Sequence, residues 1–171
     1  MGIFHSHTFN NLRDLFISQL EDLYDAEQRL TTTLPKMAEA ASSLELKQAF
    51  QRHLGQTNRH VSRLEGIFHS LGVEPKRETC QAMKGLISDG AEMIDAEGDP
   101  AVKDAALIAA AQRVEHYEMA GYGTVRAFAM HLGLPEAART LQETLDEEAY
   151  TDKILTDLAE TSINVHAQTA V

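Results

Sequence analysis

Cysteine and long apolar runs are the scarcest features of this sequence. Its one cysteine, Cys80, excludes an internal disulfide framework and is typical of a reducing compartment, so we expect a cytoplasmic protein. We expect the Cys80 thiol to lie at the surface or to be half-buried. No apolar stretch approaches the roughly 20 residues that span a bilayer, and the N-terminus has no charged segment followed by a hydrophobic one. The sequence therefore predicts no association with a membrane.

Basic charge is also in short supply. The chain has 15 lysines and arginines against 26 aspartates and glutamates, which gives a formal net charge of −11. Because nucleic-acid binding needs a basic face, we expect none here. The 171 residues, 43% of them hydrophobic, are enough for a sizeable core. We expect a single domain over residues 1–171, packed over about residues 9–163 and frayed at both ends.

The first half of the chain predicts a hairpin of two long helices. Apolar residues at steps of three and four indicate a first helix that begins after Thr8, with Pro35 kinking it or starting a new turn. Ser42-Ser43-Leu44-Glu45 matches a capping box, so we expect a turn near residues 42–43. A second long helix follows and ends at Gly72.

The second half repeats this plan after a loop and a shorter helix over about residues 80–96. Asp99 and Pro100 then mark the start of a third long helix, which runs to about Leu132. Gly133-Leu134-Pro135 predicts a second tight turn before a fourth long helix. Two hairpins joined by one long crossover with an extra short helix predict an all-α fold, a ferritin-like four-helix bundle.

Carboxylates occupy core positions in this predicted bundle. The apolar stripe of the third long helix, from residue 108 to 125, advances by threes and fours, and it includes Glu115 and Glu118. A buried carboxylate must be protonated, paired or bound to a metal, because burying the bare charge is too costly. The stripe of the first helix is interrupted in the same way by Glu27, and that of the fourth by Glu148 and Asp152.

Counting from the two turns places these carboxylates at one height. Residues equidistant from the turn of an antiparallel hairpin lie side by side. Glu118 is then level with position 149, Glu115 with position 152, and Glu27 with position 58 on the second helix. That helix offers ligand-capable side chains nearby, all on one side: His53, Gln56 and His60.

This arrangement predicts a pair of metal ions in the bundle core. Basic residues on the same helix faces are scarce, so mutual salt bridges do not explain the acids. Carboxylate-rich sites with some imidazole suit iron or manganese. The predicted ligands are Glu27, Glu115, Glu118, Glu148 and Asp152, with His53 and His60 as further candidates.

Each residue taken alone has a plainer interpretation. A single glutamate in an apolar stripe usually lies at the edge and reaches solvent, and a lone helical histidine is usually exposed or hydrogen-bonded. We expect His116 to support the ligands from behind or to face the exterior. The surface histidines would be His5, His7, His69, His131 and His166. Four tyrosines near the site could donate hydrogen bonds to carboxylates, carry an electron or simply pack in the core: Tyr24, Tyr117, Tyr122 and Tyr150.

Several runs, taken together, resemble one known family. They include Asp25-Ala26-Glu27-Gln28, Val114-Glu-His-Tyr-Glu118, Gly121-Tyr-Gly123 and Thr144-Leu-Asp-Glu-Glu148. The sequence resembles the YciE/YciF-like bacterial stress proteins of the ferritin-like superfamily over about residues 9–163. This resemblance implies a ferritin-like bundle, a homodimer, a dinuclear metal site and a role in the stress response, but it supplies no reaction.

The second helix departs from the family pattern. Members usually carry His-Leu-Glu-Glu-Thr there, whereas this chain has His53-Leu54-Gly55-Gln56-Thr57. Both glutamates are replaced, so an expected acidic ligand is missing. His60 could substitute for it, or the site could bind one metal ion or none.

Two main interpretations of function follow. In the first, the protein binds two iron or manganese ions that exchange electrons with oxygen or peroxide, as a dimetal oxidoreductase. In the alternative, it is a non-enzymatic stress scaffold with a degenerate or empty metal site. Storage inside a hollow shell is a third option, but nothing in the sequence predicts an assembly of many subunits.

Overall fold

The computed structural model describes residues 8–76 and 78–170, and its regular elements are helices. The expected positions of His5 and His7 lie outside the described residues. The helices are α1 (Leu12–Ala40), α2 (Leu44–Leu71), α3 (Gln81–Asp95), α4 (Pro100–His131), α5 (Pro135–Leu158), a π-helical turn (Ala159–Ile163) and α6 (Asn164–Gln168).

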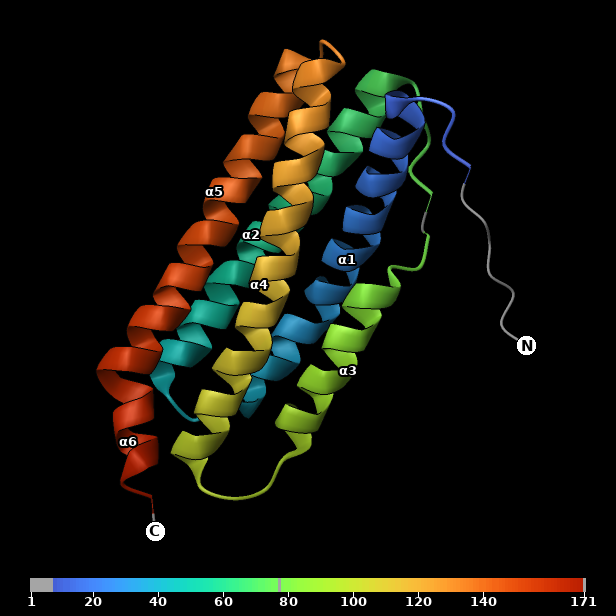
Figure 1. Cartoon of the computed structure of the whole chain (residues 1–171). Coiled ribbons are helices and arrows are strands. Elements are labelled where there is room, and N and C mark those ends of the chain that lie inside the picture. Colours follow the sequence, from blue (N-terminus) through green and yellow to red (C-terminus); the bar gives the residue numbers. More distant parts are fainter. Residues whose placement is uncertain (1–7, 77, 171) are drawn as a thin grey trace, which may run out of the picture.

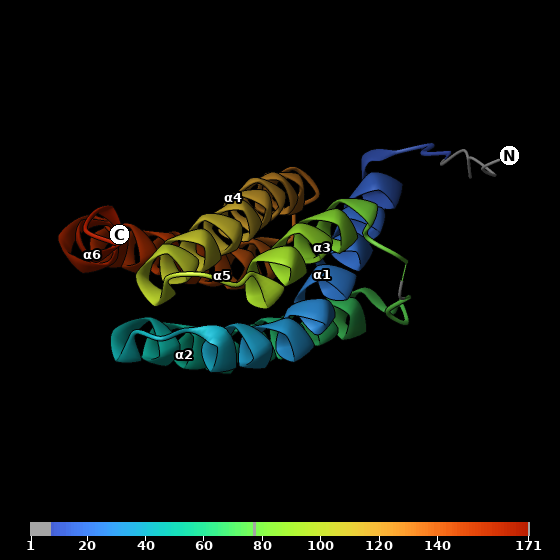
Figure 2. The same cartoon turned by 90° about the horizontal axis from the view of Figure 1, so that it is seen from below.

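The long helices α1, α2, α4 and α5 make up the body of the molecule (Figure 1). Helix α1 packs against α2, α4 packs against α5, and the two hairpins contact each other through α1 with α4 and α2 with α5. The crossover between the hairpins carries α3, which lies against α1 and α4 (Figure 2). The predicted all-α, ferritin-like four-helix bundle with a helical crossover is therefore confirmed.

The turns are fixed by local chemistry that the sequence largely predicts. Ser43 caps α2 by accepting a hydrogen bond from Leu46 N at 3.3 Å, and Asp99 caps α4 ahead of Pro100. Gly72 ends α2 with φ of 67°, which a side chain would strain. The carboxylate of Asp104 on α4 adds a contact that the sequence did not reveal. It accepts hydrogen bonds from Ser42 N at 2.8 Å and Ser43 N at 2.7 Å, so it ties the first turn to the second hairpin.

The hydrophobic core is divided in two. One cluster includes Leu34, Phe50 and Leu107, towards the α1–α2 turn. The other includes Phe16 and Phe68, towards the α4–α5 turn. A layer of buried glutamates and histidines lies between the two clusters along the chain. The two hydrophobic clusters therefore exclude water from both ends of this polar layer.

Several predictions about the ends of elements were wrong. Helix α1 begins after Asn11, whose side chain accepts from Asp14 N at 2.9 Å, rather than after Thr8. Of the two alternatives at Pro35, the new turn is wrong, since α1 continues through Met37 and Ala38, and the kink stays a prediction. Beyond Ile163 the chain forms α6 as far as Gln168, and the fraying of this tail stays a prediction.

Cys80 differs from expectation because it is buried. Its sulfur caps α3 by accepting from Met83 N at 3.3 Å, and it also contacts Tyr117 and Asp22 at 3.1 and 3.3 Å. The position at the start of a helix that packs onto the bundle explains the burial. Among the described helices, none combines the length and apolar character needed to cross a membrane.

Candidate metal centre

Six ligand-capable side chains meet in the middle of the bundle. Helix α1 supplies Glu27, α2 supplies His53 and His60, α4 supplies two glutamates and α5 supplies one. All six have at most 2% of their surface exposed. The threes and fours of the helical stripes bring them to this face, as the sequence predicted. The full set is Glu27, His53, His60, Glu115, Glu118 and Glu148.

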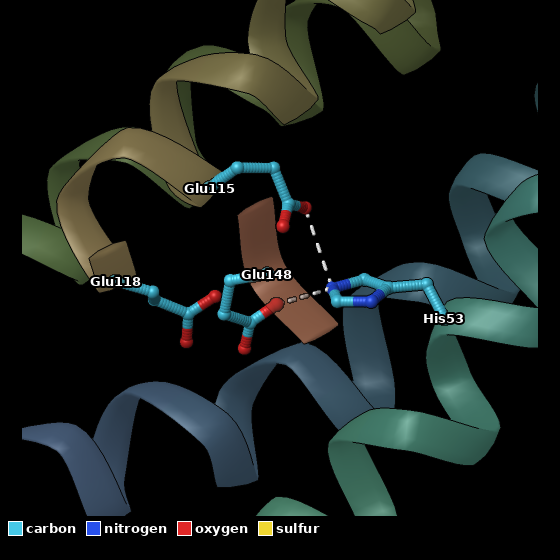
Figure 3. Close-up of side chains that lie close together, drawn as sticks. All are labelled: His53, Glu115, Glu118 and Glu148. Carbon is cyan, nitrogen blue, oxygen red and sulfur yellow. Dashed lines mark ion pairs between the residues drawn. The ribbon is translucent and has the colours of Figure 1, made fainter. Parts of the chain in front are cut away.

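One group of four surrounds His53. Its Nε2 lies 3.3 Å from Glu115 Oε1 and 3.7 Å from Glu148 Oε2. Glu118 points to the same place from one turn further along α4 (Figure 3). One ligand atom from each of these four residues lies within 4.8 Å of the others, which is a spacing that could hold a cation.

A second group shares one member with the first. His60 Nδ1 lies 3.1 Å from Glu27 Oε1 and 3.0 Å from Glu148 Oε1. These three residues also offer ligand atoms within 4.8 Å of one another. Glu148 thus turns one oxygen towards His53 and the other towards His60. This is the position that a carboxylate bridging two ions would occupy.

Both histidines are held from behind through the ring nitrogen that faces away from the centre. His53 Nδ1 lies 3.2 Å from Thr151 Oγ1 and 3.3 Å from Gln56 Oε1. His60 Nε2 lies 2.7 Å from Glu147 Oε2. A partner on the outer nitrogen fixes the ring and leaves the inner nitrogen to bind a metal, as in most protein sites with histidine ligands.

The donor set fits a cation because the inner atoms lack other partners. Buried polar atoms in proteins are nearly always hydrogen-bonded. Ten buried side-chain atoms of the described residues have no hydrogen-bond partner, and eight belong to the six clustered residues. They are Glu27 Oε2, His53 Nε2, His60 Nδ1, Glu115 Oε2, both oxygens of Glu118 and both oxygens of Glu148.

Burial makes the protein's own charges hard to sustain. It raises the pKa of Glu27 to about 7, although the nearby His60 and the hydrogen bond from Tyr122 work against the rise. Burial and the neighbouring carboxylates raise the pKa of Glu115 and of Glu118 well above the usual range. Without a cation, this environment therefore favours the protonated form of both groups.

The histidines respond to the same environment in opposite directions. Burial lowers the pKa of His53. Burial also opposes charge on His60, but the carboxylates of Glu148 and Glu27, at 3.0 and 3.1 Å from its Nδ1, raise its pKa to about 10. Burial works against the charge on Glu148 too, yet the neighbouring imidazoles of His60 and His53 keep the pKa of Glu148 below its usual value. Among the protein's own groups, an ion pair of His60 with Glu148 is the favoured arrangement.

A family model matches residues 11–168 of the chain, and its family is described as a domain of unknown function, DUF892. The chain belongs to the DUF892 family. A curated relative, Protein YciF of Escherichia coli (strain K12), is 46% identical over 158 residues, which cover 92% of this chain and 95% of YciF. The chain is thus a homologue of YciF, as the predicted resemblance to YciE/YciF-like proteins required.

Solved structures agree with the DUF892 assignment. The crystal structure of the E. coli stress protein YciF matches with a TM-score of 0.88, covering 91% of this chain and 99% of that one. YcfI from Rhodopseudomonas palustris, 40% identical, matches with a TM-score of 0.85 and covers 90% and 98%. A two-domain protein from Anabaena variabilis with a ferritin-like domain is 17% identical, with a TM-score of 0.60 and coverage of 95% and 39%. That last likeness supports the fold alone.

Asp152 is the one predicted ligand that the structure does not bring into the cluster. Its side chain is 20% exposed, and its Oδ1 lies 3.0 Å from Gln112 Nε2 and 3.3 Å from His116 Nε2. Because Asp152 lies four residues after Glu148, it stays on the same side of α5 but one turn further along. His116 faces the exterior, as one of the two predicted alternatives had it.

The departures from the family pattern on α2 differ in their consequences. Gly55 is exposed on the outer side of α2, so a glutamate there would not point into the cluster. Gln56 lies behind His53, where its Oε1 also accepts a hydrogen bond from Thr151 at 3.3 Å. The amide thus contacts the outer nitrogen of His53.

Sequence reasoning missed Glu147 as the outer partner of His60, whereas it had named Tyr122 among the tyrosines that could donate to a carboxylate. Glu147 is clamped by Arg63, whose NH1 lies 2.9 Å away, and the pKa of Glu147 falls to about 2 because Arg63 and His60 outweigh its burial. Glu147 and Glu148 are adjacent on α5 and so lie on different faces of that helix. This adjacency was the sequence signal that a second acid could approach the histidines from the outer side. Of the four tyrosines, Tyr122 is the one that contacts the cluster, donating to Glu27 Oε1 at 2.5 Å.

Proposed function

We propose that this YciF homologue binds two iron or manganese ions in the bundle core and reacts with oxygen or peroxide during stress. One ion would be held by His53, Glu115, Glu118 and Glu148. The other would be held by Glu27, His60 and Glu148, with Glu148 shared. The metal pair, when bound, would supply the capacity to exchange single electrons with an oxidant.

The protein's own residues would tune such a site. Tyr122 holds Glu27 through its hydroxyl, and Glu147 holds His60, so both side chains keep their orientation when the charge at the centre changes. The apolar clusters on either side keep bulk water away, which strengthens every charge interaction inside. Metal binding would favour the ionised form of Glu115 and Glu118, against the burial that raises the pKa values of both groups.

One observation supports the proposal most directly. Eight buried ligand atoms on six residues have no hydrogen-bond partner, and every one belongs to the two groups described above. A fold that left so many acceptors unsatisfied would lose stability, unless a ligand satisfied them. Two cations satisfy them together.

Metal loading followed by desalting tests this proposal. The unmodified protein should retain close to two iron or manganese ions per chain, measured by elemental analysis. Glu118→Ala should lose most of them, because both unpartnered oxygens of Glu118 lie in the cluster. Asp152→Asn is the matched control and should retain them, since Asp152 lies outside the cluster. An unmodified protein that emerges without metal would refute the proposal.

The alternative function, a non-enzymatic stress scaffold, is favoured by one observation. His60 lies within 3.1 Å of both Glu27 and Glu148, so a protonated imidazole could hold these carboxylates together without metal. Glu115→Leu separates the two functions. In a scaffold, replacing a buried acid by an apolar side chain should raise the melting temperature, and added metal should have no effect on the unmodified protein or on the variant. For the metal protein, the same variant should lose the extra stability that added metal gives.

We also propose that the protein acts in the cytoplasm as a homodimer. A buried, free thiol at Cys80 supports a reducing compartment. Sedimentation velocity would report the assembly: a single species of twice the chain mass is expected, and a monomer at micromolar concentration would contradict it.

A further inference from the structure

Thr57 is buried beside the candidate metal centre and has an unpartnered hydroxyl. Its relative exposure is 0%, and its Oγ1 makes no hydrogen bond. On α2 it comes four residues after His53 and three before His60, which puts all three on one helix face. The side chain therefore lies between the two candidate histidine ligands.

Among the described helical threonines, Thr57 is the one that is buried and makes no hydrogen bond through its hydroxyl. A helical threonine ordinarily bonds its hydroxyl to a carbonyl one turn back. Six threonines of α1 and α5 do so: Thr31, Thr32, Thr33, Thr140, Thr144 and Thr151. Thr57 has the same backbone option and does not use it. A valine would fill the same space without burying an unsatisfied polar group.

We propose that Thr57 Oγ1 donates a hydrogen bond to a small exogenous ligand of the metal pair, of the class of water or a small anion. The inference rests on the proposed metal function and assigns Thr57 as a positioning residue. Six ligand side chains hold the two ions from the protein side, and the Thr57 hydroxyl offers a further donor on the α2 side. Such a donor would favour ligands that carry a lone pair or negative charge.

Azide binding tests this role in iron-loaded protein in the ferric state, followed through the charge-transfer absorption that azide gives on ferric iron. Thr57→Val should weaken azide binding by roughly 10- to 100-fold, the effect of losing one hydrogen bond to a charged group. Thr57→Ser should recover most of the affinity because it restores the hydroxyl. Thr33→Val, the same change at a threonine bonded to Arg29 O, should bind azide as the unmodified protein does.

Two further measurements make the outcome decisive. Iron content should be equal in all four proteins, and metal-free Thr57→Val should melt at or above the temperature of the unmodified chain. Full iron content with undiminished azide affinity in Thr57→Val would overturn the role of Thr57 and leave the metal function standing. Loss of iron from Thr57→Val would mean that the hydroxyl binds the metal itself, and failure of the variant to fold would mean that the hydroxyl supports the fold. Either result would overturn the proposed role of Thr57. No iron in the unmodified protein would refute the metal function itself, and with it this inference.

Discussion

At the scale of single residues, the centre is organised by which atom of each side chain faces inward. His53 presents Nε2 and His60 presents Nδ1, and each has its other nitrogen occupied by an outer partner. Glu148 divides its two oxygens between them. Because Glu148 faces both histidines, side chains from α2, α4 and α5 line two adjoining positions that could hold a cation. Glu27 from α1 completes the second position.

Stability should depend on pH in a way that reports the protons held at this centre. Glu27, with a pKa of about 7, and Glu115 and Glu118, whose pKa values are also raised, bind protons more tightly in the folded chain than in the unfolded chain. His60, with a pKa of about 10, does the same above the usual histidine range. The folded state then binds more protons than the unfolded state, so the free energy of unfolding falls as pH rises.

Melting curves of the metal-free protein between about pH 5 and about pH 8 test this expectation. The melting temperature should fall with rising pH, although the lowered pKa values of His53, Glu147 and Glu148 act in the opposite direction. Metal ions displace the protons, so the stabilisation by added metal should grow over the same range. A metal-free protein that gains stability steadily towards pH 8 would contradict the assigned protonation.

At the scale of elements, the approach of α4 to α1 depends on one glycine. A Cβ built on Gly121 would lie 2.8 Å from Leu23 Cδ2, which is closer than real contacts allow. Leu23 is 2% exposed, so it has little room to move. Gly123, two residues further along α4, has no atom within 4 Å of such a Cβ. The two glycines thus lie on the same helix, but only Gly123 has room for a side chain.

Gly121→Ala should destabilise the protein by about 1–2 kcal/mol, because overpacking outweighs the better helix propensity of alanine. Gly123→Ala is the matched control and should stabilise it by up to about 1 kcal/mol. Urea unfolding of both variants measures these differences. Equal stabilisation by the two alanines would show that α1 and α4 are not in close contact at Leu23.

Much of this arrangement could be predicted from the sequence because helical periodicity and turn positions are local signals. The threes and fours around Glu115 and Glu118 fixed the buried face, and counting from two turns fixed the common height. The same counting paired Glu27 with position 58, whereas its contact is with His60. Side-chain length and helix rotation shift contacts by a few residues, and counting ignores both.

The remaining features depend on tertiary contacts that no local pattern encodes. Asp152 belongs to the same stripe as Glu148, yet one helical turn is enough to move it to Gln112 and the surface. Asp104 gives no sign in the sequence that it binds the turn at Ser42 and Ser43. The burial of Cys80 follows from the docking of α3, which the sequence predicted as a helix without showing where it packs.

At the scale of the whole molecule, the bundle is a polar layer between two apolar clusters. Side chains from all four long helices contribute to that layer, so its candidate ligands are as far apart in the sequence as Glu27 and Glu148. The long crossover through α3 sets the order of the two hairpins. The two apolar clusters can thus stabilise the fold, whereas the buried carboxylates and imidazoles between them need a bound cation to complete their interactions.

The most direct test is anomalous diffraction from crystals of the iron-loaded protein. Two peaks are predicted, one among His53, Glu115, Glu118 and Glu148, the other among Glu27, His60 and Glu148. Crystals soaked in iron that show no peak between these helices, or peaks at surface acids alone, would contradict the account. The protein would then be a bundle whose central acids are held by protons and by His60.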